Sequence, residues 1–450
     1  MNPFTGERVR EFATASDSEV AHSVADVQRA FGDWGRRTSV ATRAELVGRV
    51  GALHLAKRES LARIIVSEVG KPYVQALEEV DFAAAIYRYY AENAATLLAD
   101  QPIALAGGAG QAYLRAEPLG ALLGIMPWNF PYYQVARFAA PNLVAGNTIL
   151  LKHAPQCPES ALAIERLFTE AGLPQSVYRA LFASTDQIED VIAAPEIVGV
   201  SVTGSERAGS AVAELAGRHL KKVVLELGGS DPFLVLSADD LDAVVAHALA
   251  ARLGNGGQAC NAAKRFIIIE HLYDEFLQRF ATALALVKPG DPTAAGTALG
   301  PLSSVAAADR LGQQIDRAVA SGARAVLAGE RNGALVAPSI LTEVRPENPA
   351  YSEEFFGPVA LVFSAADEEH AIRLANDTPY GLGSYIFTND SEQAIRVAEA
   401  LETGMVFINV TEADSPELPF GGIKRSGFGR ELGVLGIGEF LNRKLVRIGG

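Results

Sequence analysis

The chain has 450 residues, 49% of them hydrophobic and 20% charged, and its formal net charge is −14. This length can bury the cores of two or three domains, and the acidic balance argues against nucleic acid or an anionic membrane surface as a main partner. The N-terminal residues MNPFTGERVREF lack the apolar core of a signal peptide, and no run approaches the roughly 18 apolar residues of a membrane span, so we expect a cytoplasmic protein.

Cysteine and histidine are too sparse for a disulfide framework or a metal centre. The two cysteines are Cys157 and Cys260, and the seven histidines are scattered, with no pair three or four residues apart. Two thiols cannot form a four-thiolate zinc site, and a helical metal site needs closely spaced histidines. We therefore predict that the protein binds no metal.

Residues 17–98 are predicted to be mainly helical, because apolar residues recur at every third or fourth position. Asp17 and Ser18 are candidate N-caps of the first helix. Beyond residue 98, short β-branched runs alternate with helical patterns, and a second cycle of the same alternation begins near residue 264. Strict alternation is typical of βαβ units with parallel sheets. The predicted fold class is therefore α/β.

The segment PWNFP, residues 127–131, places Asn129 between two prolines that fix the backbone. The side-chain amide of Asn129 is a candidate hydrogen-bond donor. Prolines alone could also mean only a rigid turn.

The predicted strand IVGVSV leads into Gly204, Ser205 and then a helix. Free amides at that helix N-terminus could bind a phosphate, or Ser205 could be only an N-cap. The segment GSERAG has the outer spacing of a P-loop, but Ser210 stands where the phosphate-binding lysine should be. We therefore reject an NTPase.

Glu226 stands inside the apolar run VVLEL, directly before two glycines. A carboxyl group surrounded by valine and leucine should have a raised pKa through desolvation, which suits a general base. The alternative is an edge-strand glutamate that points into water.

Cys260 lies in the polar stretch GNGGQACNAAKR, residues 254–265. A cysteine that only fills space belongs inside a helix or strand, whereas a thiol in a polar turn is accessible as a nucleophile. Neither His247 nor His271 forms a recognisable Cys-His motif with it, which argues against a cysteine hydrolase or acyltransferase.

Seven motifs in chain order resemble those of a known family. They are PWNFP, LLKHAP, VTGS, LELGG, GQAC, EEFFGPV and PFGGIKRSGFGREL. In this order and at these separations they resemble the aldehyde dehydrogenase superfamily, from residue 2 to residue 432. The segments KHAP, LELGGSDPF, AAKRFI and PELPFGGIKRSGFGREL are most similar to bacterial succinate-semialdehyde dehydrogenases that use NADP.

The resemblance implies a reaction in which Cys260 attacks the aldehyde and the Asn129 side chain, with the Cys260 amide, holds the oxyanion of the thiohemiacetal. Loss of hydride to a nicotinamide leaves a thioester, which water activated by Glu226 would hydrolyse. Relatives that transfer the acyl group to CoA generally lack a glutamate at this position. A non-catalytic structural protein on the same fold is the alternative of another class.

The resemblance also implies a dinucleotide site. Its expected residues are Trp128 and Lys152 at the adenosine side, Gly204 and Ser205 at the phosphates, Leu227 at the nicotinamide amide, and Glu354 and Phe356 at the nicotinamide ribose. Pro155 stands where NAD-specific relatives have a ribose-binding glutamate. That exchange favours NADP, with NAD as the alternative cofactor.

The expected substrate is succinate semialdehyde or a similar short carboxylated aldehyde, with another aliphatic or aromatic aldehyde as the alternative. Arg137, in the largely apolar stretch YYQVARFAAP, could bind the distal carboxylate, or it could form a structural ion pair. Gly254 stands where several succinate-semialdehyde enzymes have a second arginine. Ala262 replaces the second active-site cysteine of many relatives.

By resemblance, the fold has three parts. Residues 1–98 and 119–228 would form a Rossmann-like dinucleotide-binding domain, and residues 229–425 an α/β catalytic domain. Residues 99–118 and 426–450 would form a small β element that joins subunits into a homodimer or homotetramer.

Overall fold

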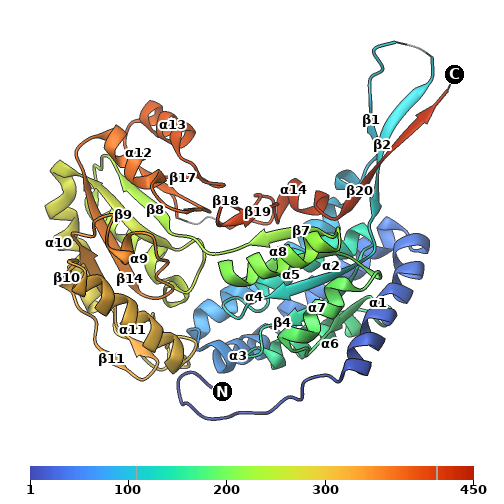
Figure 1. The fold of residues 1–450 in the computed structure, drawn as a ribbon, viewed down its shortest axis with the longest axis horizontal. Coiled ribbons are helices and arrows are strands. Elements are labelled where there is room, and N and C mark those ends of the chain that lie inside the picture. Colours follow the sequence, from blue (N-terminus) through green and yellow to red (C-terminus); the bar gives the residue numbers. More distant parts are fainter. Residues whose placement is uncertain (108, 412–413, 450) are drawn as a thin grey trace.

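The computed structural model describes residues 1–107, 109–411 and 414–449. Two halves, each with a mainly parallel sheet, lie side by side, and a narrow antiparallel ribbon projects from one of them (Figure 1). The predicted α/β class is therefore confirmed. Within the described ranges, no helix is long and apolar enough to cross a membrane.

Four helices open the chain, as the apolar periodicity predicts. They are α1 (Asp17–Arg37), α2 (Val40–Ala56), α3 (Arg58–Val69) and α4 (Tyr73–Leu97). The N-cap of α1 is Ser16 rather than Asp17 or Ser18, because its hydroxyl accepts from the Glu19 amide while the Glu19 carboxylate accepts from the Ser16 amide. The buried Trp34 donates its indole N–H to the carbonyl of Leu143 at 3.1 Å and so holds α1 against α5.

The first half contains a six-stranded sheet in the order β19-β7-β6-β3-β4-β5. Its strands are β3 (Ala121–Met126), β4 (Thr148–His153), β5 (Tyr178–Ala180), β6 (Ile197–Thr203), β7 (Lys222–Glu226) and β19 (Gly427–Phe428). All neighbours are parallel except β19 and β7. The chain proceeds outward from β3 in both directions, so the sheet is doubly wound and its switch point lies between β3 and β6.

Helices cover both faces of this sheet. The connecting helices are α5 (Tyr133–Ala145), α6 (Pro158–Glu170), α7 (Thr185–Ala193) and α8 (Glu206–Arg218). On one face the apolar core joins α1, α7 and α8, and on the other it joins α2 to α6. Successive residues of β3 alternate between these two cores, as a central strand buried on both faces must.

The second half contains a seven-stranded sheet in the order β10-β13-β14-β9-β8-β16-β17, with β10 as its antiparallel edge. Its strands are β8 (Asp231–Val235), β9 (Ala263–Ile269), β10 (Arg324–Leu327), β13 (Ser339–Thr342), β14 (Val359–Ala365), β16 (Tyr385–Phe387) and β17 (Phe407–Ile408). Its helices are α9 (Leu241–Leu253), α10 (Glu270–Leu286), α11 (Val305–Ala320), α12 (Glu368–Asn376) and α13 (Ser391–Ala400).

A 3-10 turn, η1 (Gly254–Gly257), leads from α9 toward Cys260. Gly257 has a φ of 74°, and a Cβ there would lie 2.5 Å from the carbonyl oxygen of Gly357. Only glycine fits this position without strain. The remaining short elements are β11 (Arg331–Asn332), β12 (Leu335–Val336), β15 (Tyr380–Gly381), β18 (Ile423–Lys424) and η2 (Pro349–Tyr351).

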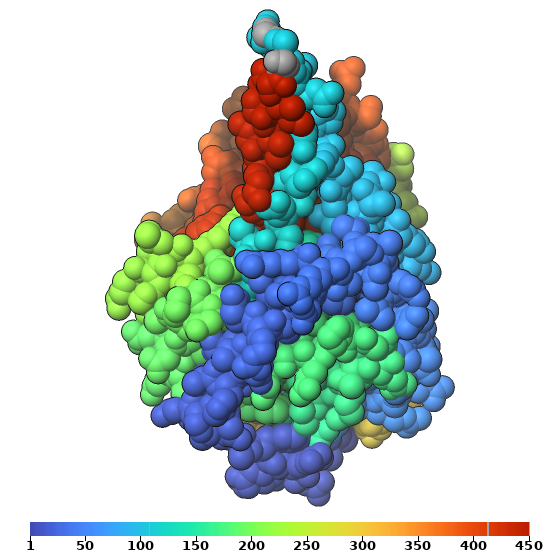
Figure 2. All heavy atoms as spheres, turned by 90° about the vertical axis from the view of Figure 1, so that its right-hand side faces the viewer, coloured from blue at the N-terminus to red at the C-terminus, as the bar shows by residue number. Residues whose placement is uncertain are grey.

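The projecting ribbon consists of β1 (Gln101–Pro102), β2 (Gln111–Pro118) and β20 (Leu441–Ile448), all antiparallel (Figures 1 and 2). Its C-terminal part begins at residue 441. Gly427 pairs with Glu226 in the six-stranded sheet, and α14 (Gly433–Gly438) packs beside α5. Gly427, Phe428 and α14 therefore lie beside β7 and α5, and the division of the chain into domains stays a prediction.

Candidate active site

Cys260 follows the turn η1 and is partly exposed. It lines a cavity of about 250 Å³. Other residues that the sequence analysis predicts for the site also line this cavity: Trp128, Asn129, Gly204, Ser205, Leu227, Glu354 and Phe356. Burial raises the pKa of the Cys260 thiol to about 12, and the positive charges of Arg137 and Lys264 oppose that rise. The thiol is therefore neutral near pH 7 in this arrangement.

Asn129 lies directly after β3, on the loop that crosses the carboxyl end of the six-stranded sheet, and its side chain is buried. Its Nδ2 donates to the carbonyl oxygen of Gln258 at 3.0 Å. The side chain of Asn255 donates to the carbonyl oxygens of both Asn129 and Gln258, at 2.9 and 3.2 Å. These bonds join the PWNFP loop to residues 254–265 around Cys260, which we call the nucleophile loop. The Asn129 amide therefore lies beside this loop.

Glu226 is the last residue of β7 and is 1% exposed. Burial raises the pKa of its carboxyl group well above the usual value, and the charge of Arg137 opposes that rise. Neither carboxylate oxygen accepts a hydrogen bond within the part of the chain described. The predicted raised pKa is confirmed, and the alternative of an edge glutamate facing water is wrong because β19 covers β7.

The N-terminus of α8 lies at the end of β6, next to the switch point of the sheet. Ser205 is its N-cap, with the hydroxyl accepting from the Ala208 amide at 3.3 Å. A Cβ at Gly204 would meet no atom within 4 Å, so the backbone there is open on the cavity side. The N-cap role does not exclude phosphate binding, because the remaining first-turn amides of α8 have no partner inside the helix.

Two aromatic rings and a carboxylate complete this cavity. The rings of Trp128 and Phe356 meet edge to face with centroids 5.8 Å apart. Glu354 accepts from the Gly229 amide at 3.2 Å and pairs with Lys264 at 3.3 Å. A cavity lined by aromatic rings, the first turn of α8 and the thiol is suited to part of a nicotinamide dinucleotide.

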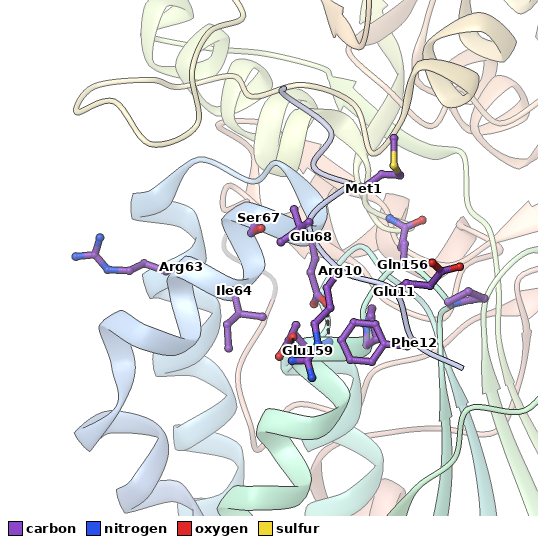
Figure 3. Close-up of a pocket in the computed structure, with 13 residues that line it drawn as sticks. Met1, Arg10, Glu11, Phe12, Arg63, Ile64, Ser67, Glu68, Gln156 and Glu159 are labelled. Carbon is purple, nitrogen blue, oxygen red and sulfur yellow. Dashed lines mark hydrogen bonds and ion pairs between the residues drawn. The ribbon is translucent and has the colours of Figure 1, made fainter. Parts of the chain in front are cut away.

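Lys152 and Pro155 lie one strand away, at the end of β4. Lys152 is half-buried, and burial lowers the pKa of its ammonium group. Pro155 lines a separate cavity of about 390 Å³ where the N-terminal segment crosses α3 and the start of α6 (Figure 3). The structure therefore does not bring these two residues to the Cys260 cavity, and their expected place at the adenosine side stays a prediction.

Arg137 is fully buried on α5, on the inner side of the site. Its guanidinium forms an ion pair with Glu431. It also donates to the Tyr133 hydroxyl at 3.1 Å and to the Thr203 hydroxyl at 3.5 Å. The structural ion pair, which the sequence analysis gave as the alternative role of Arg137, is thus present. Binding of a substrate carboxylate by Arg137 stays a prediction.

A larger cavity of about 720 Å³ lies on the other side of the nucleophile loop. Its walls include Ala259, Asn261 and Ala262 from that loop, together with Tyr133 and Tyr385. Neighbours of Cys260 in the chain thus line this second cavity, while Cys260 itself lines the smaller one. Within the described residues, no group of three or more His, Cys, Asp or Glu side chains could hold a metal ion.

Comparison with known proteins agrees with this geometry. The model of the aldehyde dehydrogenase family matches residues 1–446. The chain belongs to this family. It is 51% identical to the succinate-semialdehyde dehydrogenase (NADP(+)) of Deinococcus radiodurans over 450 residues, which are 99% of this chain and 94% of that protein. It is 44% identical to the protein of the same name from Mycobacterium avium over 454 residues, with coverage of 100% and 96%.

Solved structures of aldehyde dehydrogenases share the fold. The succinic semialdehyde dehydrogenase of Streptococcus pyogenes, in complex with NADP+, has a TM-score of 0.97 and 40% identity, with 100% of this chain and 99% of that chain covered. The predicted aldehyde dehydrogenase fold, with its cofactor sheet and catalytic sheet, is therefore confirmed.

The sequence did not predict two buried charged residues of this aldehyde dehydrogenase site, Lys264 and Glu431. Lys264 opens β9 and Glu431 is 5% exposed. Each lies next to an arginine in the chain, Arg265 or Arg430, but the ion-pair partner of each lies far away in the chain. Those pairings become visible only in the fold.

Proposed function

We propose that this aldehyde dehydrogenase oxidises succinate semialdehyde to succinate and uses NADP as its hydride acceptor. The observation that carries the proposal is the nearness of Asn129, which follows β3, and Glu226, the last residue of β7, to Cys260. The thiol and Asn129 line the same cavity. Burial raises the pKa of the thiol, and the charge of the nearby Glu226 carboxyl group raises this pKa further. This arrangement supports the roles of nucleophile for Cys260, oxyanion donor for Asn129 and base for Glu226.

In the first step, the Cys260 thiol gives its proton to a water molecule, and its sulfur bonds to the aldehyde carbon as the carbonyl π bond breaks. The carbonyl oxygen becomes an oxyanion, which the Asn129 side-chain amide and the Cys260 backbone amide stabilise. A bound nicotinamide supplies the hydride acceptor. The product on the protein is a thioester with Cys260.

In the second step, Glu226 removes a proton from a water molecule, and the resulting hydroxide attacks the thioester carbon. The bond to sulfur breaks, the carboxylic acid leaves, and Cys260 is restored. Because its oxygens have no donor in the described part of the chain and its carboxyl group is desolvated, ionised Glu226 would be a strong base.

Preference for NADP is supported by Pro155 and by the named relatives. A glutamate at this position would bind the ribose hydroxyls of NAD and repel a 2′-phosphate. Proline can do neither, and Lys152 remains to balance the phosphate charge. NAD is expected to be accepted less well.

The carboxylated substrate is supported by the relatives and by the cation at Arg137. Its guanidinium lies close enough to Cys260 for its charge to act on the thiol. The direct test is the absorbance of reduced nicotinamide during turnover, with succinate semialdehyde and butanal compared under NADP and NAD. Equal kcat/KM values for the two aldehydes would contradict the substrate, and no turnover with any aldehyde would contradict the enzyme.

We further propose a homodimer or homotetramer in the cytoplasm. The projecting ribbon is the candidate contact, because Ile103, Leu445 and Ile448 expose apolar side chains on it. Light scattering of the purified protein distinguishes the two assemblies, and a monomer would contradict both.

A further inference from the structure

Lys264 is a buried cation at the beginning of β9, and its side chain is 1% exposed. Its Nζ donates to the carbonyl oxygens of Ala259, Cys260 and Ala262, at 3.1, 2.9 and 3.3 Å. The ammonium group therefore draws together most of the peptide carbonyls of the nucleophile loop. An ammonium has three donors, so the three carbonyls leave the nearby Glu354 carboxylate as an ion-pair partner of Lys264.

This arrangement orients the backbone amide of Cys260. In a trans peptide the N–H and the preceding C=O point in opposite directions, and the structure has no cis peptide bonds in its described part. Because the Ala259 carbonyl points toward Lys264, the Cys260 N–H must point away from it. Within the described ranges that N–H donates to no protein acceptor, which leaves it free for an oxyanion.

Lys264 also reaches the cofactor side of the site through Glu354. One carboxylate oxygen of Glu354 lies 3.3 Å from Nζ and accepts from the Gly229 amide at 3.2 Å. The other oxygen lies against the backbone of Gly228, where a Cβ would approach it to 2.5 Å. Glu354 itself lines the cavity that contains Cys260. One ammonium thus links the nucleophile loop to a cavity carboxylate.

Several charges share this environment. Glu354, Asp231 and Arg252 act on Lys264 together with the Cys260 thiol. The groups that act on the thiol are Arg137 and Lys264, which favour its ionised form, and Glu226 and Asp231, which oppose it. Burial raises the pKa of the hydroxyl groups of Tyr133 and Tyr385, and the charge of the ionised thiol also raises this pKa.

A ligand hydroxyl that hydrogen bonds to Glu354 competes with Lys264 for the same carboxylate. Weakening that pair leaves more of the ammonium's field to act on Cys260, since charges in a desolvated site interact strongly. Dinucleotide binding and thiol ionisation would then be coupled through one side chain.

We propose that Lys264 is a positioning residue that aims the Cys260 amide at the oxyanion and couples occupation of the dinucleotide site, through Glu354, to the reactivity of the Cys260 thiol. The proposal rests on the proposed function, because it takes Cys260 as the nucleophile and Glu354 as a ribose ligand.

The test measures alkylation of Cys260 by iodoacetamide as a function of pH, with and without NADP. Lys264→Met should react about tenfold more slowly near pH 8, which corresponds to a rise of about one unit in the thiol pKa. NADP should accelerate alkylation of the parent and have no effect on Lys264→Met. Lys264→Arg should restore part of both responses, because it keeps the charge.

Lys221→Met is the matched control, since the Lys221 ammonium also donates to two backbone carbonyls, Ala194 at 2.9 Å and Ile197 at 2.6 Å, outside the cavity. It should follow the parent in both the pH profile and the NADP response. Cys260→Ala should take up no label at this site, which identifies the reacting thiol.

If Lys264→Met does not fold, as judged by thermal unfolding, Glu354→Gln provides the same test with the lysine in place. It should give a thiol that is more reactive without NADP and insensitive to its addition. A folded Lys264→Met, or a Glu354→Gln, with the parent's pH profile and NADP response overturns the proposal. A parent that oxidises no aldehyde overturns the proposed function instead, and alkylation still reports on Lys264.

Discussion

Replacing Arg137 by methionine separates the two roles that this residue can have. Its guanidinium is fully buried and ion-paired with Glu431, which also accepts from the Ser201 hydroxyl at 3.1 Å. Removing one partner of a buried pair leaves the other charge uncompensated and typically costs about 3–5 kcal/mol. We expect Arg137→Met to lose stability of this size, and the double variant with Glu431→Gln to recover most of it.

The substrate role makes a different prediction. A hydrogen bond between charged groups contributes about 1.5–3 kcal/mol, so losing the contact to a substrate carboxylate should lower kcat/KM for succinate semialdehyde by roughly ten- to a hundredfold. Butanal has no carboxylate and should lose far less. In the double variant, stability should return while the discrimination between the two aldehydes stays lost.

Urea unfolding measures the first effect, and initial rates of cofactor reduction with each aldehyde measure the second. Glu431→Gln alone is the control for loss of the ion pair with the arginine retained. If the double variant regains stability and still prefers succinate semialdehyde as strongly as the parent, Arg137 is structural only and the carboxylate must bind elsewhere.

Further variants test the remaining assignments. Cys260→Ala should oxidise no aldehyde while NADP binding, measured by calorimetry, is retained; residual turnover would exclude Cys260 as nucleophile. Glu226→Gln should release a burst of reduced cofactor and then turn over at least about a hundredfold more slowly; turnover at the parent rate would contradict the base assignment. Because burial raises the pKa of Glu226 and only its ionised form takes a proton from water, kcat of the parent should fall as the pH is lowered through that pKa, and a flat profile would count against it. Pro155→Glu should raise KM for NADP about fivefold, the effect of roughly 1 kcal/mol at a partly exposed site, without harming use of NAD; an unchanged KM would place the selectivity elsewhere.

Local sequence patterns predicted most of the secondary structure. Apolar periodicity was sufficient for α1 to α4, and the alternation of strand and helix was sufficient for parallel sheets. The sequence did not indicate that Gly427 and Phe428 pair with β7. β19 is only a short strand, and its place beside β7 depends on a close approach of Gly427 to Leu225, where a Cβ would lie 2.1 Å from the carbonyl oxygen. Nothing local distinguishes such a strand from a tail.

Some residues of the site could likewise be predicted from their local sequence, and others could not. Glu226 could be predicted because its own strand supplies the apolar surroundings, and the structure adds β19 as the cover. Arg137 could not be resolved from its helix alone, because its partner Glu431 lies near the other end of the chain. Lys264 was missed for a similar reason, since its ion-pair partner Glu354 lies in the loop before β14, far along the chain. Charged side chains in apolar stretches indicate that a partner exists without identifying it.

Burial acts on the nucleophile and the base in the same direction, and this explains why the buried cations matter. With a pKa of about 12, the Cys260 thiol is much harder to ionise than an ordinary cysteine, whose pKa is about 8.5. The same desolvation raises the pKa of the Glu226 carboxyl group well above its usual value. A site that kept both groups neutral throughout would not react. The cost must be offset by charges that stay in place when water leaves, and Arg137 and Lys264 are the cations that favour the thiolate. Their positions, fixed by Glu431 and Glu354, therefore set how readily the thiolate forms.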